Sequence, residues 1–280
     1  MNIPSEKEYC QQFSKSDRLK GIDALGGFAY NLDMTVPYVV TAIHAGHSIL
    51  EELAPYLAIS EADRMFEEDV ATDQIIKGNL STIWALDSRA EYDLNRTEEQ
   101  AVPFEPGQFW GLSVYRMLPP AEIKQKILSK YRSFYRFMGE FAHTLVSRFG
   151  ICVIYDIHSY NISRQVEKGF EPPPVFNLGT SMLNRDRWKP LIDSWMQELS
   201  TISIFGHSTT VAENLVFQGR GALCQTMQEL DENILVLPTE ISKIYMNEHT
   251  GILKQSVITE LNIGLKKAVD LHSRQFLKRT

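Results

Sequence analysis

Two histidines and one glutamate stand where buried strands should end. His44 follows the apolar run "VPYVVTAI", His158 follows "ICVIYDI", and Glu240 lies within "NILVLPTEI". An ionisable side chain in such surroundings needs a partner, because burying it alone is expensive. Neutral imidazole is the commonest protein ligand for zinc, and a carboxylate beside a metal can act as a base. These residues therefore indicate a candidate hydrolytic metal site.

Each of these residues also has a purely structural interpretation. His44 and His158 could be a hydrogen-bonded pair in the core, and Glu240 could form a salt bridge with a lysine or arginine. Asp156 precedes His158 by two residues on the same face of the strand, where it could orient the imidazole ring. Ser159 points to the opposite face, and the sequence has no GxSxG turn. A serine hydrolase is therefore not expected.

Apolar patterns predict the elements that would hold these residues. Positions 121–149 repeat apolar residues at three- and four-residue steps before Gly150, which is typical of a long amphipathic helix. The β-branched run that follows does not alternate, as expected of a parallel strand covered on both faces. Alternating strands and helices predict an α/β fold with a mostly parallel sheet, in which ligands bind at the carboxyl ends of strands. Further strands are predicted near 36–46, 202–206 and 233–241, and further helices at 61–78, 185–199 and 254–278.

Composition limits the classes of protein to consider. The 280 residues, 44% hydrophobic and 22% charged, suit one domain spanning 1–280, with an N-terminal extension at 1–30 and the last helix packed on it. No apolar run is long enough to span a bilayer and the N-terminus lacks a signal-peptide pattern, so we expect a cytoplasmic protein without membrane partners. A net charge of −7 with scattered basic residues argues against nucleic acid as a partner. The widely spaced Cys10, Cys152 and Cys224 predict neither disulfides nor a cysteine zinc site.

Four motifs in a fixed order strengthen the metal-site interpretation. They are "IHAGH" at 43–47, "YDLNR" at 92–96, "DIHSYN" at 156–161 and "PTEISKIYM" at 238–246. Together they resemble the N-formylglutamate amidohydrolase family, a branch of the zinc carboxypeptidase-like hydrolases. The resemblance covers roughly residues 36–250. It implies a three-layer α/β/α fold of the zinc carboxypeptidase or phosphorylase/hydrolase-like type, with a mixed, mostly parallel sheet and the metal at its carboxyl edge.

The resemblance implies one zinc ion, or another divalent metal, held by His44, His158 and a third ligand. In peptidases of the wider group that ligand is a glutamate three residues after the first histidine, where this sequence has His47. The amidohydrolase branch carries acids in the following helical segment, here "MFEEDVATDQII", in which Asp69 and Asp73 are one turn apart. We favour Asp69 as the third ligand, followed by Asp73 and then His47. The alternative is that these acids belong to a solvated helix face.

The remaining motifs imply the chemistry of the substrate. Asn95 and Arg96, assisted by Arg89, would hold a substrate carboxylate, since a planar guanidinium beside an amide suits that group. Arg96 would also stabilise the oxyanion, and Glu240 would take a proton from water and pass it to the leaving amine. The implied reaction is hydrolysis of the N-formyl, or another small N-acyl, amide of an acidic amino acid such as N-formylglutamate. The alternatives are a metallo-carboxypeptidase, a deacylase for another acyl group, and a catalytically inactive ligand-binding protein, which His47 in place of the glutamate supports.

Overall fold

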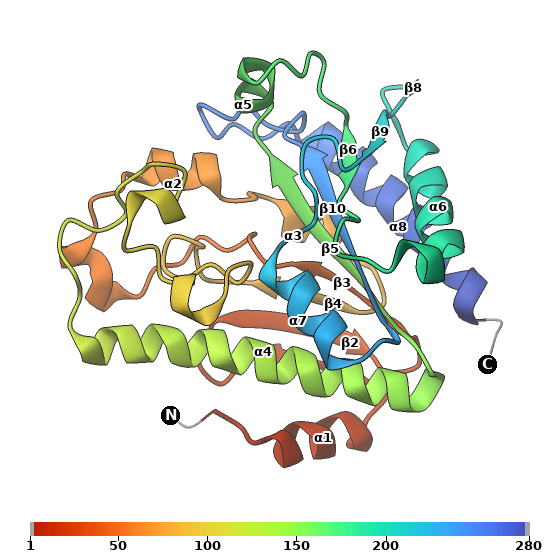
Figure 1. Cartoon of the computed structure of the whole chain (residues 1–280), viewed down its shortest axis with the longest axis horizontal. Helices are drawn as coiled ribbons and strands as arrows, with labels where there is room; N and C mark the ends of the chain where they lie inside the picture. The colour runs from red at the N-terminus through yellow and green to blue at the C-terminus, as the bar shows by residue number, and fades with distance from the viewer. Residues whose placement is uncertain (1–2, 278–280) are drawn as a thin grey trace.

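The computed structural model describes residues 3–277, which form a mixed eight-stranded β-sheet with helices on both faces (Figure 1). The strands of this sheet are β1 (Arg18–Ile22), β2 (Phe28–Asp33), β3 (Tyr38–Ala42), β4 (Thr82–Ala85), β5 (Cys152–Tyr160), β6 (Phe176–Leu178), β9 (Val211–Glu213) and β10 (Ile234–Ser242). They lie in the order β1-β2-β4-β3-β5-β10-β6-β9. The central strands β4, β3, β5 and β10 run parallel, whereas β2 pairs antiparallel with β1 and β4, and β6 with β10. The predicted α/β fold with a mixed, mostly parallel sheet is confirmed.

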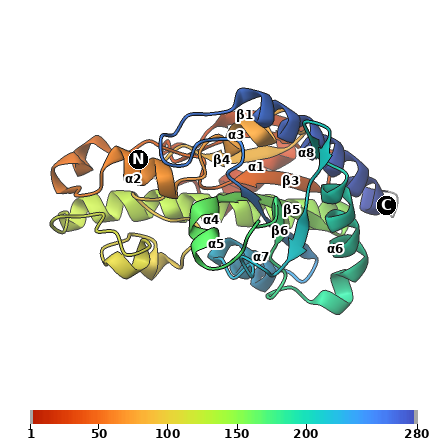
Figure 2. The same ribbon diagram turned by 90° about the horizontal axis from the view of Figure 1, so that it is seen from above.

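The helices form two outer layers (Figure 2). One layer contains α1 (Glu6–Lys15), α4 (Ala121–Phe149) and α7 (Ala222–Leu230), and the other contains α3 (Thr72–Ile76), α6 (Arg185–Ser200) and α8 (Gln255–Leu277). The shorter elements are α2 (Glu61–Glu67), α5 (Ile162–Glu167), the 3-10 helices η1 (Glu51–Tyr56), η2 (Glu98–Gln100) and η3 (Pro106–Gln108), and the hairpin of β7 (Ser203–Ile204) and β8 (His207–Ser208). None of the helices in residues 3–277 combines the length and the apolar character needed to cross a bilayer.

The segment from α4 to β5 shows how the sequence builds these layers. The apolar stripe of α4 is buried, including Phe134, Phe137 and Phe141. Gly150 ends the helix at φ +73°, where its N–H donates to the carbonyl of Val146, a left-handed ending that glycine adopts without steric cost. All nine residues of β5 are buried, as expected of a strand covered on both faces. The helix and strand predicted here are confirmed.

The structure differs from the predicted elements in two places. Residues 61–78 do not form one helix, because α2 ends at Glu67 and α3 begins at Thr72, with Ala71 between them at φ +65°. The strand predicted near 202–206 forms only the β7–β8 hairpin, outside the main sheet. Several other elements were not predicted, and most of them are too short to show a clear periodicity: the strands β1, β2, β4, β6 and β9 and the helices α1, α5 and α7.

The first and last segments that the structure describes both belong to the layered fold. Residues 3–30, expected as an N-terminal extension, form α1, β1 and the start of β2, which supply one edge of the main sheet. The helix predicted at 254–278 corresponds to α8, which packs on α3 and α6. Residues 1–2 and 278 of those predicted segments lie outside the described residues.

Candidate active site

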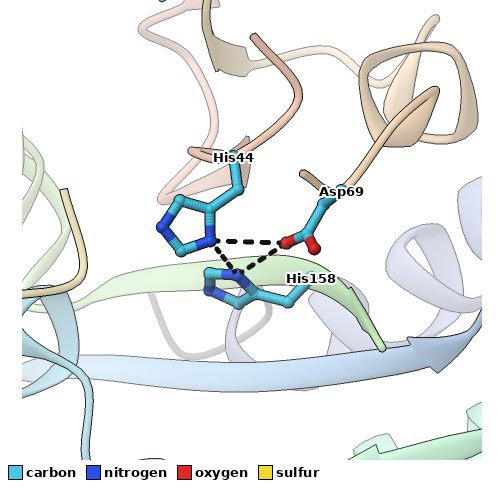
Figure 3. A group of neighbouring side chains, drawn as sticks. All are labelled: His44, Asp69 and His158. Carbon is cyan, nitrogen blue, oxygen red and sulfur yellow. Dashed lines mark hydrogen bonds and ion pairs between the residues drawn. The ribbon is translucent and has the colours of Figure 1, made fainter. Parts of the chain in front are cut away.

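Three buried side chains from separate segments meet at the carboxyl end of the central strands (Figure 3). His44 follows β3, His158 lies near the end of β5, and Asp69 lies between α2 and α3. The Asp69 Oδ2 atom is 3.2 Å from Nδ1 of His158 and 3.4 Å from Nδ1 of His44. The two Nδ1 atoms are 3.1 Å apart. Two nitrogens and one carboxylate oxygen therefore converge on one point.

The spacing of these three atoms fits a metal ion. Ligand atoms about 2.0–2.2 Å from a tetrahedral ion lie about 3.3–3.6 Å from one another. The three separations in the structure run from 3.1 to 3.4 Å. Three protein ligands would leave a fourth coordination position open. His44, Asp69 and His158 thus form a group that could hold a metal ion.

Each histidine of this group is held by a carboxylate through its other ring nitrogen. The Nε2 atom of His158 is 2.8 Å from Asp156 Oδ2, and that of His44 is 2.8 Å from Asp93 Oδ1. Such contacts place the proton on Nε2 and leave Nδ1 free to bind a metal. The contact between Asp156 and His158 agrees with the sequence-based expectation. Asp93 was not predicted, although it is an acid among apolar and aromatic neighbours inside the "YDLNR" motif.

Two of the carboxylates around the imidazoles, Asp69 and Asp93, have lowered pKa values although they are buried. Burial raises the pKa of Asp69, but in the metal-free protein hydrogen bonds from His158 and His44, each protonated on Nδ1 as well, outweigh this effect and hold that pKa well below its ordinary range. Burial likewise raises the pKa of Asp93, whereas the charges of Arg89 and His44 bring it well below the ordinary value. A buried group that keeps its negative charge is suited to binding a cation.

The structure separates the three candidates for the third ligand. The carboxylate of Asp69 points at the two histidines from the non-helical segment between α2 and α3. Asp73 lies in the first turn of α3, so the two aspartates do not share a helix face as predicted. His47 is 44% exposed, and its Nδ1 atom is 2.5 Å from Glu68 Oε2. Of the three, Asp69 alone lies in the group that could hold a metal.

The group of His44, Asp69 and His158 opens into a cavity of about 290 Å³ that Glu240 also lines. Glu240 of β10 pairs in register with His158 of β5, so the two side chains share one face of the sheet. Burial raises the pKa of Glu240 to about 8, with His158 lowering it and Asp69 adding to the rise. A cation bound at the group would lower this pKa, because a positive charge favours the carboxylate. Glu240 thus lies where a base for water would be needed.

The same cavity is lined by Asn95, Arg96 and Arg89, which differ in their burial and in their hydrogen-bond partners. The Oδ1 atom of Asn95 is buried without a hydrogen-bond partner among residues 3–277, and its side chain lies against Gly221. Arg96 is exposed, and its guanidinium makes no hydrogen bond or ion pair with the residues that the structure describes. Arg89 is buried, and its Nη2 and Nε atoms donate to Asp93 Oδ2 at 2.7 and 3.2 Å. Arg96 is therefore free to bind an anion, whereas Arg89 mainly holds Asp93.

Comparison with known proteins identifies the family. Residues 36–246 match the family model described as N-formylglutamate amidohydrolase. The chain belongs to the N-formylglutamate amidohydrolase family. The resemblance seen in the four motifs is therefore confirmed.

Two solved structures with TM-scores above 0.5 share the fold of this family member. The crystal structure of N-formylglutamate amidohydrolase from Ralstonia eutropha JMP134 is 19% identical, with a TM-score of 0.68 over 88% of this chain and 95% of that one. A gene product of Agrobacterium tumefaciens is also 19% identical, with a TM-score of 0.58 over 92% and 97% of the two chains. A metallo-carboxypeptidase from Burkholderia cenocepacia is 13% identical, with a TM-score of 0.43 over 98% and 70%. No curated protein matches the sequence.

Three further basic side chains line the cavity of this N-formylglutamate amidohydrolase family member, and none was predicted as a site residue. Arg220 is exposed, and its Nε atom donates to Ser181 Oγ at 3.4 Å. Arg164 of α5 forms a bidentate ion pair with Glu67, with Nη1–Oε2 and Nη2–Oε1 distances of 2.9 and 2.5 Å. Lys243 directly follows β10 and donates to the backbone carbonyl of Phe66 at 2.6 Å. The only available sequence clue to Lys243 was its place inside the "PTEISKIYM" motif.

Proposed function

We propose that the protein hydrolyses the N-acyl amide of a small acidic amino acid, such as N-formylglutamate, with zinc held by His44, Asp69 and His158. The observation that carries this proposal is the convergence of those three ligand atoms on a cavity that Glu240 lines. Membership of the N-formylglutamate amidohydrolase family supports it. The cavity of about 290 Å³ lies near the lower end of the roughly 300–1,000 Å³ typical of small-molecule sites, which favours a metabolite over a polypeptide. A zinc ion held there would act as a Lewis acid toward the amide carbonyl and lower the pKa of water.

The side chains around the cavity would perform the remaining steps. Glu240 would take a proton from the attacking water and pass it to the nitrogen of the leaving amine as the carbon–nitrogen bond breaks. Arg96, beside Asn95, would bind a carboxylate of the substrate and stabilise the oxyanion. Arg89 would contribute mainly by fixing Asp93, since most of its donors already contact the protein. The products are the free carboxylic acid and the amino acid.

The replacement Glu240→Gln tests the assignment of the base. The variant keeps the size of the side chain and leaves the three ligands in place, so it should retain zinc and lose about 100-fold or more in kcat. Zinc per chain is measured by mass spectrometry, and turnover by release of formate from N-formyl-L-glutamate. Glu232→Gln, at a side chain that is 80% exposed, is the matched control and should retain full activity.

The same experiment separates the proposed enzyme from its alternatives. Unimpaired turnover by Glu240→Gln would exclude Glu240 as the base. A wild-type protein that hydrolyses another N-acyl group, but not N-formyl, would be a deacylase with the same site. A wild-type protein that binds the amino acid and contains no metal would be a ligand-binding protein instead.

A further inference from the structure

Lys243 is a buried cation of the cavity to which the proposed reaction gives no role. Its backbone N–H donates to the carbonyl of Tyr160 at 3.0 Å, which extends the pairing of β10 with β5 and fixes where the side chain begins. The side chain is 2% exposed, and its ammonium donates to the carbonyl of Phe66 at 2.6 Å. An ammonium group has three donors. Two of them remain available to a ligand in the cavity.

Lys243 also differs from two other cations of the cavity, which have carboxylate partners. Arg89 pairs with Asp93 at 2.7 Å and Arg164 with Glu67 at 2.5 Å. Among residues 3–277, no carboxylate oxygen lies within 4.0 Å of the Lys243 ammonium. Burial accordingly lowers the pKa of Lys243 to about 8. An anion entering the cavity would supply the counterion that the protein does not.

Lys243 and Arg96 approach the cavity from different segments of the chain. The segment of Arg96 lies at the start of α7, where the carbonyl of Asn95 accepts from the N–H of Ala222, whereas Lys243 directly follows β10. The backbone carbonyl of Arg96 accepts a hydrogen bond from Tyr131 of α4, whereas Lys243 contacts Phe66 of α2. Two cations without a carboxylate partner among the described residues, Arg96 and Lys243, therefore reach the cavity from different elements.

We propose that Lys243 binds a second carboxylate of the substrate, so that the cavity selects dicarboxylic N-acyl amino acids. This inference rests on the proposed function, in which Arg96 binds one carboxylate. An N-acyl derivative of an acidic amino acid carries two carboxylates, and each would meet one cation. A substrate that lacks the carboxylate for Lys243 leaves a buried ammonium unpaired, which weakens binding strongly, and one that lacks the other carboxylate loses its contact with Arg96. Lys243 is thus a specificity-determining residue.

Three substrates and the variant Lys243→Met test this role. N-formyl-L-glutamate has both carboxylates, N-formyl-L-glutamine lacks the side-chain carboxylate, and 4-formamidobutanoate lacks the α-carboxylate. For the wild type, kcat/KM should be roughly 100-fold higher with the dicarboxylate than with either analogue. Lys243→Met should lose roughly 100-fold on the dicarboxylate and less than about threefold on one of the two analogues. The analogue on which the loss vanishes identifies the carboxylate that Lys243 binds.

The controls separate a binding role from a structural one. Lys254→Met removes an exposed ammonium that likewise donates to a backbone carbonyl, that of Ile244 at 3.1 Å, and should change no ratio. Lys243→Arg keeps the charge and should recover part of the preference for the dicarboxylate. Equal losses by Lys243→Met on all three substrates would show that Lys243 only supports Phe66 and would overturn the inference. If neither Lys243 variant folds, the wild-type ratios decide, and equal wild-type rates on the three substrates would overturn it.

A failure of the proposed function gives a different result. A wild-type protein that hydrolyses none of the three compounds refutes that function without testing Lys243. Calorimetry with glutarate and with butyrate then tests the two-cation cavity by itself. Glutarate should bind to the wild type at least about tenfold more tightly than butyrate, and Lys243→Met should abolish that difference. Equal binding of the two acids to the wild type would overturn the inference.

Discussion

Buried histidines occur in two regions of this molecule, and the partners of their ring nitrogens differ. At the carboxyl edge of the sheet, His44 and His158 contact carboxylates through both ring nitrogens. In the layer between β5, α6 and α8, the Nδ1 atom of His272 is 2.6 Å from the Tyr155 hydroxyl and its Nε2 atom 2.8 Å from the Leu191 carbonyl. All three histidines are at most 3% exposed. Burial alone therefore does not distinguish the candidate site from the core.

The pKa values of the histidines follow their partners. Burial lowers the pKa of His158, but the charge of Asp156 outweighs this effect and raises the pKa well above its ordinary value. At His272 burial prevails over the hydrogen bond to Leu191, and the pKa falls to about 4. The surrounding carboxylates, rather than the histidines themselves, thus mark the region that attracts a cation.

The largest expected difference between the two regions is in metal content and activity. His158→Ala removes one of three ligands, so the variant should lose its zinc and at least about 1,000-fold in kcat/KM, because several kcal/mol of transition-state stabilisation go with the metal. His272→Gln should retain both within about threefold, since Gln can still donate to Leu191 and accept from Tyr155. Zinc analysis and the deformylation assay check both variants. Full zinc content in His158→Ala would contradict the assigned site.

The two histidines of the candidate metal site could be identified from the sequence because each follows a long apolar run that a short window of sequence reveals. The third ligand was harder to place. The pattern of residues 61–78 predicts one helix, but the helix is interrupted between α2 and α3. In this interruption the backbone N–H of Asp69 donates to the carbonyl of His44 at 3.0 Å. That contact joins segments far apart in the sequence, so helical periodicity could not show it. The structure thus brings Asp69 to the two histidines, although the single helix on which it was expected does not form.

The residues whose roles depend on contacts in the folded protein were the hardest to predict from the sequence. Asp93 and Lys243 lie inside quoted motifs, but their roles depend on contacts with His44 and Phe66 that no local pattern records. The strands β6 and β9 have only three residues each and are set by pairing with neighbours. Long strands and helices could thus be predicted from periodicity, whereas the contacts that complete the inner surface of the cavity could not.

A smaller difference between the two regions, in zinc affinity, is expected when the side chains that contact the histidines are replaced and the histidines themselves are kept. Asp156→Asn replaces the carboxylate that contacts Nε2 of His158 by a neutral amide, and should weaken zinc affinity about 10- to 100-fold. Tyr155→Phe removes the hydroxyl that contacts His272 and should leave zinc affinity within about twofold. Competition with a chromogenic chelator measures both affinities. Equal losses in the two variants would show that the site responds to packing rather than to its carboxylates.

The smallest expected effect concerns stability at mildly acidic pH and belongs to the core histidine. The pKa of His272 falls from its ordinary 6.5 to about 4 on folding, so at pH 5 the unfolded chain binds a proton that the folded chain does not. Stability is therefore fully present above about pH 6.5 and is lost as the pH falls toward 4, by about 1.5 kcal/mol between pH 6.5 and pH 5. The reason is structural: Leu191 accepts from Nε2, Tyr155 donates to Nδ1, and the rings of Trp195 and Phe276 pack around the imidazole without supplying a carboxylate.

Denaturant unfolding of the metal-free protein at pH 6.5 and pH 5 measures this effect without a contribution from zinc release. His272→Gln cannot titrate, so its stability should fall by about 1.5 kcal/mol less than that of the wild type over the same interval. The carboxylates of the candidate site titrate in both proteins, and their contribution cancels in the difference. An identical fall in both proteins would mean that His272 is protonated in the folded state, and the electrostatic contrast between the two buried histidine regions would then be wrong.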